Sequence, residues 1–132
     1  WLLNTASAAQ LGLASTGHAS RGTAGPPGVS THNLHITPGE RDLNGLTGDA
    51  GTGLLVTSMF GPSLNGNTGD WSAGVSGFWF EDGQIAWPVS EVTVAGNLKD
   101  LYARLTRGSD LEFRGSFNVP SLMFDAVAIA GK

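Results

Sequence analysis

The chain of 132 residues is 40% apolar and 14% charged, which indicates one globular domain over residues 1–132 and excludes a disordered protein. Its net charge is −4 and its 7 Lys and Arg residues are scattered singly, so no basic patch is present to bind nucleic acid. It has no cysteine, no apolar run of about 20 residues and no signal-peptide pattern; this excludes disulfides and a membrane-spanning segment and makes the cytoplasm the expected location.

The expected fold is α+β and mostly β, with antiparallel or mixed sheets, a long hairpin and two or three short helices. The 20 glycines favour turns and β structure. The first element is a short helix from Leu2 to Leu11, which Gly12 would end as a left-handed cap. A long loop over residues 15–30 leads to a strand from His32 to Thr37, and a brief helix follows from Asp42 to Asp49.

The middle of the chain predicts a strand and then a long hairpin. Leu54 to Phe60 is an apolar run that we expect to be buried on both faces, and a loop follows over residues 61–68. Strands from Trp71 to Glu81 and from Gln84 to Ala95 flank Asp82-Gly83. This pair suits a two-residue type I′ turn, in which both residues have positive φ.

The second hairpin strand carries a change of phase and leads into a helix. One face of its first half is expected to carry Ile85, Trp87 and Val89. The alternation changes phase at Ser90-Glu91, which predicts a β-bulge that resets the register. Asn97 is the expected N-cap of a helix that Gly108 ends. Two further strands, near residues 111–117 and 122–129, complete the chain.

Patterns typical of a catalytic or metal site are missing from the sequence. His32 and His35 are three residues apart on an expected strand, so they would point to opposite faces and not chelate one ion. His18 lies in the long loop without a carboxylate at a suitable spacing. No H-E-x-x-H and no G-x-S-x-G occurs. We therefore predict no catalytic residue, no metal ligand and no cofactor site in this chain.

The aromatic residues of the hairpin have two interpretations. Phe78 and Phe80 share a face opposite Trp79, so one set belongs to the core and the other is exposed or interfacial. Core packing explains most aromatic residues. A tryptophan opposite a packed pair also marks a partner surface. The candidate peptide or partner surface comprises Asn65, Asp70, Trp71 and Trp79.

Several short motifs follow one another in a specific order, although each is an ordinary turn or cap. They are Ala8-Ala9-Gln10-Leu11-Gly12-Leu13, Thr16-Gly17-His18-Ala19, Thr31-His32-Asn33-Leu34, Gly51-Thr52-Gly53-Leu54-Leu55-Val56, Asp110-Leu111-Glu112, Pro120-Ser121-Leu122, Ala130-Gly131 and, most densely, residues 69–98. In this order they resemble the C-terminal region of the PmbA/TldD family, the paired bacterial proteins also called TldD and TldE or modulators of DNA gyrase.

The resemblance implies a role in proteolysis. In that family TldD and TldE pair as a metalloprotease that degrades or matures unfolded or flexible peptides, and TldD holds the metal through an H-E-x-x-x-H helix and a C-terminal cysteine. This chain has neither the motif nor the cysteine and looks like the TldE (PmbA) branch. The resemblance therefore carries over no catalytic residue, and zinc is expected only in a TldD-like partner.

The sequence thus predicts the non-catalytic C-terminal β-rich domain of a longer TldE/PmbA-like protein, since the chain opens on Trp1 within a helical pattern. Its expected partners are a TldD-like subunit in a heterodimer, an unfolded peptide and, in isolation, a second copy of itself. Its expected work is to form a chamber wall, to pair subunits and to guide peptide. The alternative is a stand-alone β-domain that binds a small ligand or a protein and has no proteolytic role. A self-sufficient metallopeptidase does not fit, because three suitable ligands do not converge.

Overall fold

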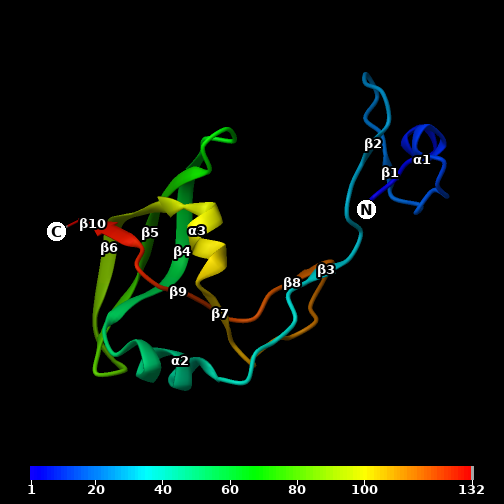
Figure 1. Cartoon of the computed structure of the whole chain (residues 1–132). Helices are drawn as coiled ribbons and strands as arrows, with labels where there is room; N and C mark the ends of the chain where they lie inside the picture. The colour runs from blue at the N-terminus through cyan, green and yellow to red at the C-terminus, as the bar shows by residue number, and fades with distance from the viewer. Residues whose placement is uncertain (132) are drawn as a thin grey trace. The chain divides into compact units, whose positions relative to one another are not determined.

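The computed structural model describes residues 1–131, which are mostly β with three short helices, as the sequence predicts (Figure 1). The chain divides into two compact units. The first comprises Trp1–Ile36 with Phe113–Asn118, and the second comprises Thr37–Glu112 with the segment from Val119 onward. The single domain over residues 1–132 stays a prediction.

The first unit holds one helix and two short strand pairs. Helix α1 (Thr5–Leu11) starts one turn later than expected, because Asn4 is its N-cap and accepts a hydrogen bond from the Ser7 N–H at 2.8 Å. Gly12 ends it at φ 65°, as predicted. Strands β1 (Ala19–Ser20) and β2 (Gly28–Val29) pair antiparallel within the expected loop.

The other strand pair of this unit is parallel. The expected strand from His32 to Thr37 contracts to β3 (Leu34–His35), which pairs with β8 (Phe117–Asn118). The Asn118 side chain is buried, and its Oδ1 accepts from the N–H groups of Arg114 and Gly115 at 2.7 and 3.1 Å. These local bonds replace most of the strand expected over residues 111–117.

The second unit is a four-stranded antiparallel sheet with two helices. Its strands are β4 (Gly53–Leu64), β5 (Asp70–Glu81), β6 (Gln84–Asn97) and β10 (Ala128–Ala130), in the order β10-β6-β5-β4. Helix α2 (Leu43–Ala50) precedes β4, and helix α3 (Leu98–Ala103) follows β6. Two short strands, β7 (Leu105–Arg107) and β9 (Leu122–Phe124), pair with each other.

Local signals in the hairpin are confirmed. Asp82 and Gly83 have φ of 49° and 73°, as a type I′ turn requires. Ser90 and Glu91 lie between the Val89–Gly77 and Val92–Val75 pairs, opposite the single residue Ser76, so they form the predicted bulge. Glu91 takes a φ of 56° there.

Three expectations about the second unit were wrong. Ile85 does not share a face with Trp87, because a register shift places Ile85 opposite Phe80 and Trp87 opposite Trp79. Strand β4 is not buried on both faces, because it is the edge of the sheet and is exposed from Val56 onward. Helix α3 ends at Ala103 rather than near Gly108, because the chain turns there into β7.

The core of the second unit lies on one face of the sheet. It consists of Ala73 and Val75 on β5 with Val92 and Val94 on β6, and Val75 has no exposed surface. Four partly buried residues pack against this cluster: Leu54, Trp71, Val89 and Val127. Leu101 of α3 is buried over Gly96, where an added Cβ would lie 3.0 Å from the leucine Cδ1.

Candidate interaction surface

Two cross-strand rows of apolar side chains extend the core face toward the hairpin turn. Residues directly opposite each other on antiparallel strands share a face. The first row is Leu54, Trp79 and Trp87, and the second is Val56, Gly77 and Val89. The indole rings of Trp79 and Trp87 are stacked, with centroids 6.5 Å and planes 22° apart. We call the five apolar side chains of these rows the tryptophan face.

The tryptophan face is only partly covered within the second unit. Trp87 is 48% exposed and Val56 39%, whereas Val75, a few residues along the same face, is fully buried. Met59, which pairs with Val75, is 52% exposed. Large apolar side chains that stay exposed together are typical of surfaces that bind another protein or a hydrophobic segment.

Strand β4 gives this face a free edge. It is the last strand in the order β10-β6-β5-β4, and its pairing with β5 shifts register between Val56 and Ser58 and between Phe60 and Ser63. Pro62 lies in the register shift between Phe60 and Ser63. Strand pairing is interrupted there, so the lack of a backbone N–H on proline is tolerated. An edge strand presents backbone N–H and C=O groups that an extended peptide can pair with.

Asn65 and Asp70 belong to a polar turn at the other end of β5. Asn65 Oδ1 accepts from the Asn67 N–H at 3.0 Å, and its backbone N–H donates to Asp70 O at 2.9 Å. The Thr68 hydroxyl donates to Asp70 Oδ2 at 2.7 Å, and Asn97 Nδ2 donates to Asp70 Oδ1 at 3.1 Å. Two hydrogen bonds hold the pKa of Asp70 below its ordinary value of 3.8. The bond from Thr68 makes the larger contribution and the bond from Asn97 the smaller one.

The structure separates the four predicted surface residues into two places. Asn65 lies in the turn before β5, Asp70 and Trp71 are the first two residues of β5, and Trp71 packs against the core cluster. Trp79 lies near the other end of β5 and meets Trp87, which the sequence analysis did not select. The pairing of Trp79 with Trp87 depends on a register shift next to the hairpin turn, which the alternation of residues does not show. The assignment of all four to a peptide or partner surface stays a prediction.

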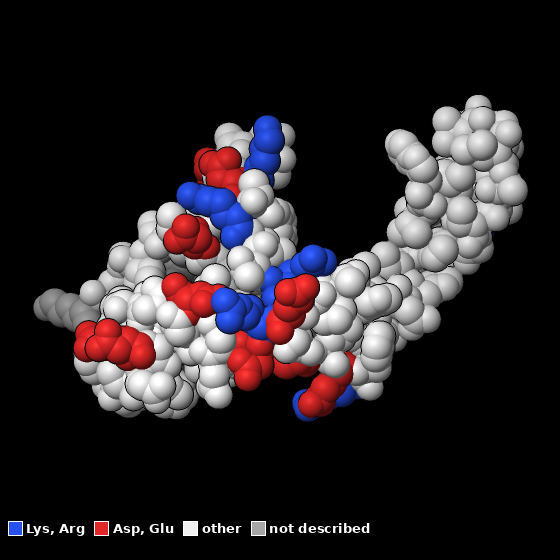
Figure 2. Space-filling view, turned by 60° about the horizontal axis from the view of Figure 1, so that its bottom comes forward, with Lys and Arg blue, Asp and Glu red and all other residues white. Residues whose placement is uncertain are grey.

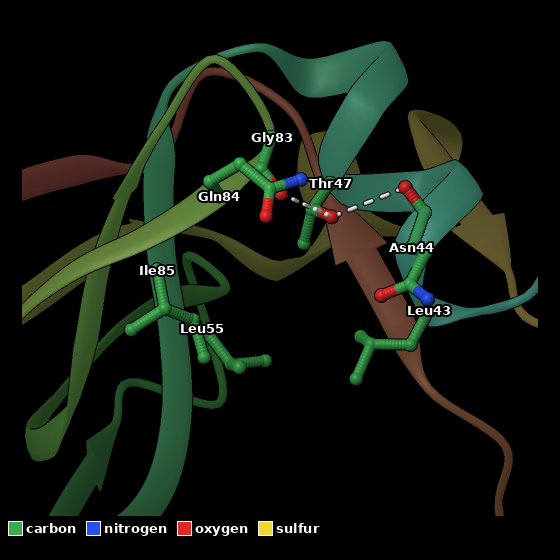
Figure 3. Close-up of a pocket in the computed structure, with 7 residues that line it drawn as sticks. All are labelled: Leu43, Asn44, Thr47, Leu55, Gly83, Gln84 and Ile85. Atoms are coloured by element: carbon green, nitrogen blue, oxygen red, sulfur yellow. Dashed lines mark hydrogen bonds between the residues drawn. The ribbon is translucent and has the colours of Figure 1, made fainter.

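A pocket of about 250 Å³ lies on the opposite face of the sheet, between α2 and the hairpin turn (Figure 3). The Thr47 hydroxyl points between the main-chain carbonyls of Asn44 and Gly83, at 3.1 and 3.2 Å. The hydrogen bond from the Thr47 hydroxyl to the Gly83 carbonyl holds the hairpin turn against α2. The lining residues are Leu43, Asn44, Thr47, Leu55, Gly83, Gln84 and Ile85.

The structure places His32 and His35 against different partners and adds a contact between His18 and His32 that the sequence did not predict. His18 lies against His32, with ring centroids 5.1 Å apart, while His35 lies edge-on to Phe113 at 5.4 Å. No group of three or more His, Cys, Asp or Glu side chains able to hold a metal ion occurs among residues 1–131. Within the same residues, no helix is long and apolar enough to cross a membrane.

Comparisons with known proteins place this chain among a defined set of relatives. Residues 1–131 match the family model described as the PmbA/TldA metallopeptidase C-terminal domain. The chain is 41% identical over 133 residues to "Metalloprotease PmbA" of Escherichia coli O157:H7 and 38% identical to a "Metalloprotease PmbA homolog" of Haemophilus influenzae. These alignments cover 100% and 99% of this chain and 28% of each relative.

Solved structures give the same result. A putative modulator of a DNA gyrase from Thermotoga maritima matches with a TM-score of 0.82 and 28% identity, over 98% of this chain and 30% of the other. A putative modulator of DNA gyrase from Bacteroides thetaiotaomicron matches with a TM-score of 0.76 and 34% identity, over 100% of this chain and 28% of the other. The chain therefore spans less than a third of the length of the proteins it matches.

Proposed function

Because this chain belongs to the PmbA/TldD family of metallopeptidases, as its C-terminal domain, we propose that it serves a TldE/PmbA-like subunit that pairs with a TldD-like metalloprotease in the bacterial cytoplasm. In this proposal the domain is non-catalytic. It forms part of the wall of the proteolytic chamber, contacts the partner subunit and guides unfolded or flexible peptides toward the partner's metal.

The tryptophan face carries this proposal. Trp79 and Trp87 stack in a row of large apolar side chains that the second unit leaves partly exposed. Aromatic residues dominate the energetics of protein interfaces, because each buries a large area at a small cost in side-chain entropy. A subunit contact over this face would cover the apolar side chains that the domain itself leaves open.

Strand β4 supports the peptide-guiding part of the proposal. An unfolded peptide presents its backbone N–H and C=O groups, and an exposed edge strand pairs with them whatever the peptide's sequence. β4 is 12 residues long and forms one edge of the four-stranded sheet. Main-chain pairing of this kind suits a protease that acts on flexible peptides of varied sequence.

The charge of the chain argues against a direct role on nucleic acid. The net charge is −4. Figure 2 shows Lys and Arg side chains interleaved with Asp and Glu on the face drawn, rather than gathered into a basic patch. Arg41 and Asp49 form an exposed ion pair, with Nε and Oδ2 3.2 Å apart. Phosphate backbones are bound by clustered cations, so we propose peptide and protein partners and no nucleic acid.

The proposal assigns the chemistry to the partner. Peptide hydrolysis needs an activated water or a nucleophile, and we propose that a zinc ion in the TldD-like subunit supplies it. The test is to assay cleavage of an unstructured peptide with three preparations: the subunit that carries this domain, a TldD-like subunit, and both together. We expect metal-dependent cleavage only when both are present.

Two results would contradict the proposal. Metal-dependent cleavage by the subunit that carries this domain, without a partner, would make it a catalyst in its own right. Full activity of the TldD-like subunit alone would leave this domain without the proposed role and would favour the stand-alone binding domain instead.

A further inference from the structure

The β1–β2 pair brings together His18 and His32, which are 14 residues apart in the sequence. The register pairs Ala19 with Val29, and the next bond along the ladder runs from the Ser30 N–H to the His18 carbonyl at 3.0 Å. His32 follows Ser30 by two residues and lies in a bend after β2. The two imidazole rings lie with centroids 5.1 Å apart and planes 33° apart.

The Thr16 hydroxyl orients the His18 ring through a hydrogen bond at Nδ1. The Thr16 hydroxyl oxygen lies 3.2 Å from the Leu3 carbonyl oxygen and accepts a hydrogen bond from the Leu3 N–H at 2.8 Å. His18 Nδ1 lies 2.9 Å from the same hydroxyl oxygen. Nδ1 is engaged by this hydroxyl, and Nε2 takes part in none of the hydrogen bonds described for residues 1–131, so Nε2 is the ring nitrogen open to an ion. A hydrogen bond at the other ring nitrogen is how proteins orient a metal-binding histidine.

The spacing of the two rings also fits a shared ion. Two imidazoles bound to one ion at a metal–nitrogen distance of about 2.0–2.1 Å, with a tetrahedral angle between them, have ring centres about 5 Å apart. His32 is exposed, and none of the hydrogen bonds described for residues 1–131 involves its ring. The ring is therefore free to turn a nitrogen toward His18 Nε2.

We propose that His18 and His32 form an exchangeable site for a divalent transition-metal ion. The site is distinct from the catalytic zinc assigned above to a partner subunit. The first unit contains no Asp or Glu, so its carboxylates cannot complete the coordination, and water fills the remaining positions. Two imidazoles fall short of the three or four protein ligands of a resident zinc site. The ion therefore exchanges readily, and Cu²⁺ binds more tightly than Zn²⁺ or Ni²⁺ in keeping with the Irving–Williams order.

The test is a Cu²⁺ titration of metal-free protein prepared without a histidine tag, followed by electron paramagnetic resonance. We expect one Cu²⁺ per chain with nitrogen ligands, and binding that weakens as the pH falls because the ion competes with protons for both rings. His18→Ala and His32→Ala should each lower the affinity at least tenfold. His35→Ala is the matched control and should leave the affinity unchanged, because the His35 ring instead contacts Phe113.

Three outcomes would overturn the proposal. One is a double variant lacking His18 and His32 that binds Cu²⁺ as well as the parent. Another is a loss of affinity in His35→Ala as large as that in His32→Ala, which would indicate non-specific binding to exposed imidazoles. A third is a copper spectrum without nitrogen ligands. Circular dichroism of each variant would show whether a loss of affinity reflects a loss of fold.

Discussion

Asn97 Nδ2 donates a hydrogen bond to Asp70 Oδ1 at 3.1 Å, which joins the last residue of β6 to the first residue of β5. The same amide nitrogen donates to the Thr68 carbonyl at 2.8 Å, and Asn97 Oδ1 accepts from the Lys99 N–H at 3.2 Å. One side chain therefore caps α3 and fastens the turn that starts β5. The helix and the turn should lose stability together when it is removed.

Asn97→Ala should lower the free energy of unfolding by about 1–2 kcal/mol, because both the N-cap and the bonds to the turn are lost. Urea denaturation measures this change. Asn97→Ser is the matched control: serine is as good an N-cap, but its shorter side chain does not reach Thr68 or Asp70. We expect its stability to fall between those of the parent and the alanine variant. An unchanged Asn97→Ala variant would mean that this side chain does not hold the helix start.

The pH dependence of stability should involve Asp110. Its carboxylate accepts from the Ser121 hydroxyl at 2.6 Å and from the Ser121 N–H at 2.7 Å, and these bonds lower the pKa of Asp110 below its ordinary value of 3.8. A carboxyl group with a lowered folded-state pKa stabilises the protein above its unfolded-state value. That contribution is lost as the pH falls through the folded-state pKa.

Ser121→Ala should therefore raise the pKa of Asp110 toward 3.8, because the hydroxyl makes the largest contribution to the shift. A carbon-detected NMR titration of the carboxyl group measures this directly. Ser109→Ala is a suitable control, since the Ser109 side chain takes part in none of the hydrogen bonds described for residues 1–131. A pKa of Asp110 that stays the same in Ser121→Ala would show that this hydroxyl does not stabilise the carboxylate.

Features set by neighbouring residues could be predicted from the sequence, and features set by distant strands could not. The Asp82-Gly83 turn, the Ser90-Glu91 bulge and the Asn97 cap each depend on a few adjacent residues, and the structure confirms all three. The position of Ile85 depends on a second register shift near the hairpin turn, which the alternation of residues did not reveal. The exposure of β4 depends on its place at the sheet edge, which an apolar run does not specify.

The tryptophan face and the His18–His32 pair also depend on contacts between strands that the local sequence does not specify. The alternation of side chains along β5 predicts that Trp79 lies opposite Phe78 and Phe80, but the contact of Trp79 with Trp87 depends on the hairpin register. The His18–His32 contact depends on a pairing between two-residue strands inside residues 15–30, for which the sequence predicts a loop. A short antiparallel pair between glycine-rich segments leaves little trace in the hydrophobic pattern.

Gly83→Val should destabilise the second unit by roughly 1–2 kcal/mol or more, because a β-branched residue adopts a φ of 73° poorly. An added Cβ would also lie 3.0 Å from the Gly48 Cα of α2. Thermal unfolding measures the loss. Gly66→Val is the control, since Gly66 has no atom within 4 Å of an added Cβ and its φ is not positive. Equal melting temperatures for both variants would contradict the turn geometry.

Trp87→Ser should weaken the pairing with a TldD-like subunit, whereas Ile85→Ser should not. The two side chains lie two residues apart on β6 and are 48% and 61% exposed, but they lie on opposite faces of the sheet. Removing an exposed apolar side chain changes the stability of the free domain little, so a loss of binding would come from the interface. Isothermal titration calorimetry of the two variants against the partner measures the difference. If Ile85→Ser weakens pairing as much as Trp87→Ser, or if neither does, the tryptophan face is not the contact, and the subunits meet through another surface.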